Sequence, residues 1–305
     1  MTMVKGKGGI QAKVIADSVS KIGIRITTLQ LRYPRFIHGE LMTHRMLSRN
    51  AASSRAIPVR KMLDQVARDP AMPITWGMNQ PGMQSVDEIR NPLSGEQLWL
   101  EASHEAYDLA ADMMDLGLHK QVTNRILEPF QFMETVVTAT EWDNFFALRI
   151  HKDAQPEIQE LAVCMSRAMD DSTPVVRTDT WHLPYVSNDE LGDIRSLQDA
   201  LKCSAARCAR VSYLNHDKSR PSIEDDIALY DMLATRPFDD GKGHVLGEGD
   251  PVHLSPLEHQ AGPMKTNIAL SLPGFYMEKG VTHIDSKESL WSGNFRGWIQ
   301  YRQLI

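Results

Sequence analysis

Alternating apolar and polar positions predict two strands. Residues 22–33 alternate with a period of two, and the phase of the alternation changes at the Thr27–Thr28 pair. This alternation is typical of a strand, and the phase change predicts a bulge or twist at the threonines. The apolar segment 130–138 predicts a second strand. Pro34 is expected to end the first strand and to begin a helix.

Helical spacing and capping residues predict most of the remaining elements. The expected helices run over about 34–49, 58–69, 95–116, a short segment carrying Arg125, 140–149, 156–169, a segment through 205–207, and 222–234. Arg45 and Arg49 are expected on one face of the first helix, because residues four apart are neighbours on a helix. Two long loops are predicted at 70–92 and 172–195. The mixture of strands and helices predicts an α/β (mixed α+β) fold, and no linker divides residues 1–305 into two domains.

Composition narrows the class of protein. The 305 residues are 42% hydrophobic and 24% charged, with a formal net charge of -6, as in soluble globular proteins. An acidic balance argues against binding to polymeric nucleic acid, which needs a basic surface. No apolar run reaches the roughly 18 residues of a membrane span. The three cysteines form no CxxC pair, which favours buried thiols in a reducing compartment, so we expect a cytoplasmic location without a membrane partner.

The segment from residue 43 to 56, THRMLSRNAASSRA, concentrates groups that can bind an anion. The planar guanidinium of arginine donates two parallel hydrogen bonds to a phosphate, and serine hydroxyls complete the shell. Ser53, Ser54, Arg55 and Arg125 are therefore candidate phosphate ligands. A solvated helix end rich in arginine and serine is the alternative interpretation, and composition alone leaves both open.

Other motifs give little support to metal, acyl-transfer or phosphate-loop chemistry. The segment HLSPLEH, residues 253–259, is not an HExxH motif, and its two histidines would not share a helical face. No GxSxG elbow or Cys/His nucleophile pattern is present. The glycine-rich segment 239–250 lacks the order of a phosphate loop and is expected to be a flexible insertion. We therefore predict no metal site.

Four blocks of sequence, taken together, resemble the flavin-dependent thymidylate synthase family, also known as thymidylate synthase complementing proteins. The blocks are THRMLSRNAASSR at 43–55, NFFALR followed by AQPEI within 144–158, ARVS at 209–212, and HLSPLEH at 253–259. In typical members the last two blocks precede the arginine-rich one, so the motif order here is circularly permuted. Thr43 and Ala51 stand where the family signature has an arginine and an acidic residue.

The resemblance implies a central twisted sheet flanked by helices, and a role for each matching residue. Cofactor-binding positions are His44, Arg45, Asn50, Asn144, Ser212, Ser255 and Glu258. Substrate-binding positions are Glu40, Ser53, Ser54, Arg55, Arg125 and Arg149, with Arg125 expected from a neighbouring subunit. Catalytic positions are Arg149, which would face the pyrimidine, and His253, near the flavin and folate.

The implied reaction is reductive methylation of dUMP at C5 to dTMP. Methylenetetrahydrofolate would donate the carbon, and FAD reduced by NADPH would supply the hydride. The family also implies a homotetramer with active sites at the subunit interfaces. Two alternatives stay open: a flavin- and folate-dependent hydroxymethylase of dUMP or dCMP on the same fold, and a non-catalytic nucleotide-binding homologue.

Overall fold

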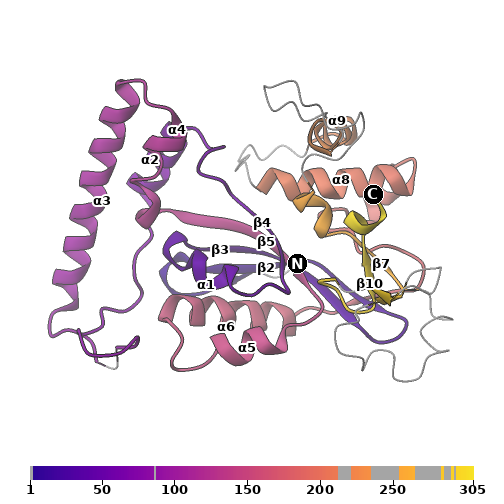
Figure 1. Cartoon of the computed structure of the whole chain (residues 1–305), viewed down its shortest axis with the longest axis horizontal. Helices are drawn as coiled ribbons and strands as arrows, with labels where there is room; N and C mark the ends of the chain where they lie inside the picture. The colour runs from indigo at the N-terminus through magenta and orange to yellow at the C-terminus, as the bar shows by residue number, and fades with distance from the viewer. Residues whose placement is uncertain are drawn as a thin grey trace.

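A six-stranded sheet lies at the centre of the molecule (Figure 1). The structure is a computed structural model that describes residues 3–85, 87–211, 221–234, 254–264, 283–284, 290–291 and 293–305. The strands lie in the order β1 (Met3–Lys5), β2 (Gln11–Ser20), β3 (Arg25–Pro34), β5 (Phe132–Ala139) and β4 (Ser48–Ala51), and β6 (Val175–Arg177) pairs with β2. Only the β2–β6 pairing is parallel. The mixed α/β class is therefore confirmed.

The two predicted strands are the centre of this sheet. β3 is paired along its length with β2 on one side and with β5 on the other. Leu29, Leu31 and Tyr33 are fully buried on one face, as period-two alternation requires. The irregularity predicted at Thr27–Thr28 occurs in the pairing of β3 with β2, opposite Thr28 and Leu29, but the extra residue, Ile15, belongs to β2 and not to β3.

Two helices cover the apolar face of the sheet (Figure 1). They are α5 (Asp143–Arg149) and α6 (Pro156–Asp170), and both agree with the predicted segments. Leu161 and Met165 of α6 are fully buried against β2 and β3. Their burial removes apolar surface from water, which is the main force holding this layer to the sheet.

The predicted helix 34–49 is wrong over its second half. Pro34 is the last residue of β3, and it is followed by the 3-10 turn η2 (Arg35–Ile37) and the short helix α1 (His38–Met42). The chain then turns and forms β4, antiparallel to β5. Pairing with β5 satisfies the backbone of β4, so tertiary contacts override the local helical pattern. Arg45 and Arg49 therefore do not share a helical face.

A helical group lies at one end of the sheet (Figure 1). It contains α2 (Val59–Arg68), α3 (Pro92–Asp115) and α4 (Lys120–Thr123), packed around a cluster that includes Met62, Leu63 and Ala110. Gly117, with a φ of 77°, follows the end of α3 because glycine tolerates this left-handed conformation. Arg125 lies just beyond α4 rather than on it.

The described segments that follow β6 cover the second face of the sheet. They contain α7 (Asn188–Leu191), α8 (Leu197–Arg210), α9 (Ile223–Ala234), η5 (Ser255–Glu258), β7 (Ala261–Pro263) and β10 (Trp298–Gln300). The predicted cap of α9 is confirmed, since the Asp225 backbone N–H donates to Ser222 Oγ at 3.1 Å. The remaining short elements are η1 (Lys7–Gly9), η3 (Glu128–Phe130), β8 (His283–Ile284), β9 (Leu290–Trp291) and η7 (Tyr301–Leu304).

Three further features bear on the sequence predictions. The loop at 70–92 is irregular until α3 begins at Pro92, whereas the loop at 172–195 contains β6 and α7. All three cysteines are buried and free. Within the described ranges, no helix combines the length and apolarity that crossing a membrane requires.

Candidate functional site

Segments from distant parts of the chain meet around β4, the strand of the arginine-rich block. On β4, Asn50 Nδ2 donates to the carbonyl of Cys208, next to the ARVS block on α8, at 2.7 Å. Gln300 Nε2 donates to both Ser48 Oγ and the carbonyl of Glu258 in η5, at 2.8 Å each. The blocks at 43–55, 209–212 and 253–259 therefore adjoin in space, although more than 150 residues separate the first from the other two.

Arg149 joins the remaining block, at 144–158, to the arginine-rich segment 43–55. At the C-terminal end of α5, its Nε donates to His44 Nε2 at 2.8 Å. Its Nη2 donates to Thr43 Oγ1 at 3.2 Å and to the Glu40 carbonyl at 3.4 Å. A guanidinium can only donate hydrogen bonds, so His44 Nε2 must accept and the imidazole must be neutral.

The surroundings of His44 favour this neutral form. The side chain is buried, and its ring meets Phe145 edge to face, with centroids 4.8 Å apart. Burial lowers the pKa of His44, and the nearby guanidinium groups of Arg149 and Arg49 lower it further. His44 therefore acts as an acceptor that orients Arg149.

A second cluster gathers two of the predicted phosphate ligands around one carboxylate. Glu128 Oε1 accepts from Arg125 Nη1 at 2.7 Å, from Arg35 Nη2 at 2.8 Å and from Ser54 Oγ at 3.2 Å. Ser54 is buried, whereas the Arg125 side chain is 52% exposed.

Glu128 and Arg35 were not predicted as parts of this cluster. The sequence does indicate a pair between Glu128 and Arg125, because residues three apart on a helical turn can form an ion pair. Arg35 had no comparable signal. It reaches Glu128 because η2 and η3 pack against each other.

Several predicted ligands present donors at the surface. Arg45, Arg55 and Asn144 are exposed, and their side chains make no hydrogen bond or ion pair with any described residue. Ser53 is half-buried beside Arg55. These side chains can therefore meet a ligand without breaking an internal contact.

The predicted cofactor positions in the C-terminal half are only partly described. Ser255 begins η5, and Glu258 forms an ion pair with Arg302 of the tail. Ser212 and His253 lie outside the described residues, as does the glycine-rich segment 239–250.

A buried polar chain supports the second face of the sheet. Thr28 Oγ1 lies 2.7 Å from Thr138 Oγ1 and 2.8 Å from His182 Nε2. His259 Nδ1 lies 2.9 Å from Thr138 Oγ1, and His182 Nδ1 lies 2.9 Å from Ser18 Oγ. Both histidines are fully buried, and burial lowers the pKa of each to about 3. His259 is thus a neutral core residue, and no group of potential metal ligands is found among the described residues.

The fold is mixed α/β, and it brings the arginine-rich segment 43–55 next to Arg149 of α5, to Cys208 beside the ARVS block and, through Gln300, to Glu258 of η5. The family model described as thymidylate synthase complementing protein matches residues 24–175. Over this part of its length the chain belongs to that family. The match includes the blocks at 43–55 and 144–158 and excludes the other two.

Solved structures with a similar fold include a UMP/dUMP methylase, PolB from Streptomyces cacaoi. Its complex with 5-Br dUMP shares 15% identity at a TM-score of 0.45, covering 54% of this chain and 92% of that one. Its complex with 5-Br UMP shares 16% identity at a TM-score of 0.44, covering 54% and 91%. No curated protein matches the sequence.

Proposed function

We propose that the protein is a flavin-dependent thymidylate synthase that converts dUMP to dTMP. Family membership over residues 24–175 supports an enzyme that acts on a pyrimidine nucleotide. The observation that supports this particular reaction is the 2.8 Å hydrogen bond from Arg149 to His44. It joins the two family blocks that lie within residues 24–175. Methylenetetrahydrofolate is the proposed carbon donor, and NADPH is the proposed reductant.

In this proposal Arg149 acts on the pyrimidine and the serine–arginine cluster binds the phosphate. A guanidinium beside the ring favours its electron-rich, deprotonated form, in which C5 is more nucleophilic toward the donated carbon. Ser53, Ser54, Arg55 and Arg125 would donate to the phosphate. Exposed Arg55 is available at once, whereas Arg125 must exchange its bond to Glu128 for one to the phosphate.

The residues present fit a flavin dinucleotide. Exposed Arg45 and Asn144 are donors without partners among the described residues, as a pyrophosphate requires, and Ser255 and Glu258 adjoin β4 through η5. When bound, the flavin supplies the hydride that reduces the transferred carbon. Buried His44 would act on this site indirectly, by holding Arg149.

We also propose that the whole chain is one domain with permuted motif order, assembled as a homotetramer with active sites at the interfaces. Contacts of β4 with α8 and η5 support the single domain. Along α3 and the turn after it, Leu98, Leu109 and Leu116 are 66%, 59% and 80% exposed. Such an apolar row on a surface helix supports burial against another subunit.

A hydroxymethylase of dUMP or dCMP is the second candidate, favoured by one contact. Thr43 stands where the family signature has an arginine, and its hydroxyl accepts from Arg149. Compared with the family signature, the site therefore has one positive charge fewer beside Arg149, the arginine proposed to face the pyrimidine. This change supports a different base, or release of a hydroxymethyl product in place of a methyl one.

The test combines flavin binding with product mass. The purified protein, supplied with FAD, is incubated with NADPH, methylenetetrahydrofolate and either dUMP or dCMP. A nucleotide heavier by one CH2 unit supports the methylase, and one heavier by one CH2O unit supports the hydroxymethylase. Binding of nucleotide without any new product supports a non-catalytic homologue.

Variants assign the roles. Arg149→Ala is expected to keep flavin and lose turnover, whereas Arg55→Ala is expected to weaken nucleotide binding. Exposed Arg195, outside the site, provides the control Arg195→Ala. Normal kinetics in both site variants, or no FAD binding by the wild type, would overturn the proposal.

A further inference from the structure

A pocket lies between the second face of the sheet and α8, apart from the clusters described above. Its volume is about 350 Å³. Six of the residues that line it are Lys13 and Ile15 of β2, Tyr185 and Val186 of the segment before α7, and Arg207 and Arg210 of α8. Pockets of this size, mostly apolar with a few charged groups, are typical of small-molecule sites.

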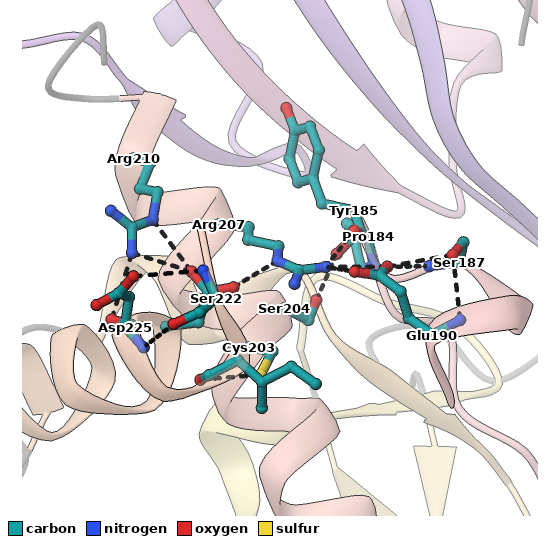
Figure 2. A network of polar contacts seen from close by, with 12 residues as sticks. Pro184, Tyr185, Ser187, Glu190, Cys203, Ser204, Arg207, Arg210, Ser222 and Asp225 are labelled. Carbon is teal, nitrogen blue, oxygen red and sulfur yellow. Dashed lines mark hydrogen bonds and ion pairs between the residues drawn. The ribbon is translucent and has the colours of Figure 1, made fainter. Parts of the chain in front are cut away.

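The two arginines are held in place by carboxylates behind the pocket. Asp226 of α9, which is fully buried, accepts from Arg207 Nε at 2.6 Å and from Arg210 Nε at 3.1 Å. Glu190 pairs with Arg207 Nη1 at 3.0 Å. Figure 2 shows Arg207 reaching from α8 toward Glu190 and the Tyr185 backbone. Neither carboxylate is among the described residues that line the pocket.

The pocket therefore presents cationic donors that lack internal partners. Lys13 Nζ, Arg207 Nη2 and Arg210 Nη1 make no hydrogen bond or ion pair with any residue in the described ranges. Fixed guanidinium groups with free N–H bonds are strong binders of carboxylates and phosphates. Their positions are set by Asp226 before any ligand arrives.

Tyr185 also lines the pocket and has an unusual backbone conformation. It is the only non-glycine residue among those described with a positive φ, at 64°. Its carbonyl accepts from Arg207 Nη1 at 2.9 Å, and its hydroxyl donates to Gln30 Oε1 at 3.0 Å. In Figure 2 its ring points away from the guanidinium of Arg207. An unfavourable left-handed conformation, maintained by contacts at both ends of the residue, is typical of functional sites.

We propose that this pocket binds a small organic acid with a flat apolar body. The carboxylate or phosphate of the ligand would lie between Lys13 and the free nitrogens of the two arginines. Its apolar body would cover Ile15 and Val186. The pocket shares no residue with the proposed nucleotide site, whose residues lie on α5 and in the segment 43–55. Arg210 belongs to the ARVS block, two residues before the predicted flavin position Ser212, so the test is made on protein loaded with FAD.

Calorimetric titration tests this assignment with two probes, phenyl phosphate and 2-naphthoate. The protein is first saturated with dUMP and FAD, so that neither probe can report on the proposed nucleotide or flavin site. We expect at least one probe to bind once per chain, and the tighter probe identifies the preferred acid. Lys13→Glu is expected to weaken that binding about tenfold or more, because it reverses one charge of the site.

Two further variants test whether the binding depends on this pocket. Lys21→Glu places the same charge change on an exposed lysine just after β2 and should leave binding unchanged. Val186→Trp should block the pocket without changing its charge. The proposal is overturned if neither probe binds at millimolar concentration, if Lys13→Glu and Val186→Trp both bind like the wild type, or if Arg55→Ala abolishes binding.

Discussion

Replacing His44 by alanine tests how the proposed active site is held together. The resemblance to the family implies that His44 contacts the flavin, whereas in the structure its Nε2 accepts from Arg149 at 2.8 Å. If His44 mainly positions Arg149, His44→Ala slows turnover and retains flavin. If His44 mainly contacts the flavin, the variant loses flavin.

The structure sets the expected size of the effect. A hydrogen bond to a charged group contributes about 1.5–3 kcal/mol, equivalent to a rate change of roughly 10- to 150-fold. Arg149 keeps its bonds to Thr43 and the Glu40 carbonyl, and it is half-exposed. We therefore expect the lower end of the range, a decrease in kcat of about tenfold.

The assay measures kcat, KM for the nucleotide and flavin absorbance for each variant. His44→Gln should restore part of the rate, because the glutamine amide oxygen can also accept from Arg149. A double variant with Arg149→Ala should be no slower than Arg149→Ala alone, since the two residues act as a unit. A kcat for His44→Ala within about twofold of wild type, or additive losses in the double variant, would refute the positioning role.

Two further predictions concern stability. Asp226→Ala removes the fully buried carboxylate that Arg207 and Arg210 share and leaves Glu190 as the remaining carboxylate partner of Arg207. It should therefore lower the free energy of unfolding by about 3 kcal/mol, the lower end of the range for breaking a buried ion pair, whereas Asp64→Ala, which removes an exposed ion pair, should cost about 0.5 kcal/mol or less. Urea denaturation compares them, and a loss below about 1 kcal/mol for Asp226→Ala would contradict the prediction. His182 and His259 are held neutral with pKa values of about 3, below the ordinary 6.5. Their contribution to stability is therefore complete above about pH 6.5 and falls as the pH drops toward 3, by up to about 1.4 kcal/mol per pH unit for each histidine. His259→Gln should flatten this dependence, and an unchanged slope would show that the histidine does not cause it.

The strand–helix pattern predicted much of the fold. β3 and β5 and the helices α2, α3, α5, α6, α8 and α9 lie where the sequence indicated. Most of those elements bury an apolar stripe or face, which is the feature that periodicity reports, whereas Leu98 and Leu109 of α3 are exposed. The helix over 34–49 failed because β4 is stabilised by pairing with β5, a strand more than 80 residues away. Local spacing carries no information about such a partner.

The candidate site, like the fold, could be predicted from the sequence only in part. The kinds of residue were evident from sequence, since arginine, serine and histidine in one segment indicate an anion site, and resemblance supplied the family. The contacts between them were not evident. Glu128 as the common acceptor for Ser54 and Arg125 depends on the packing of η2 against η3.

The sequence by itself therefore determined the class of fold, the family over residues 24–175 and the chemical character of the arginine-rich segment. Only the tertiary structure decided that His44 is neutral and accepts from Arg149, and that the arginines of α8 leave free donors in a pocket. The physical reason is that protonation, burial and hydrogen-bond direction depend on neighbours distant in sequence. Those neighbours become known only when the chain is folded.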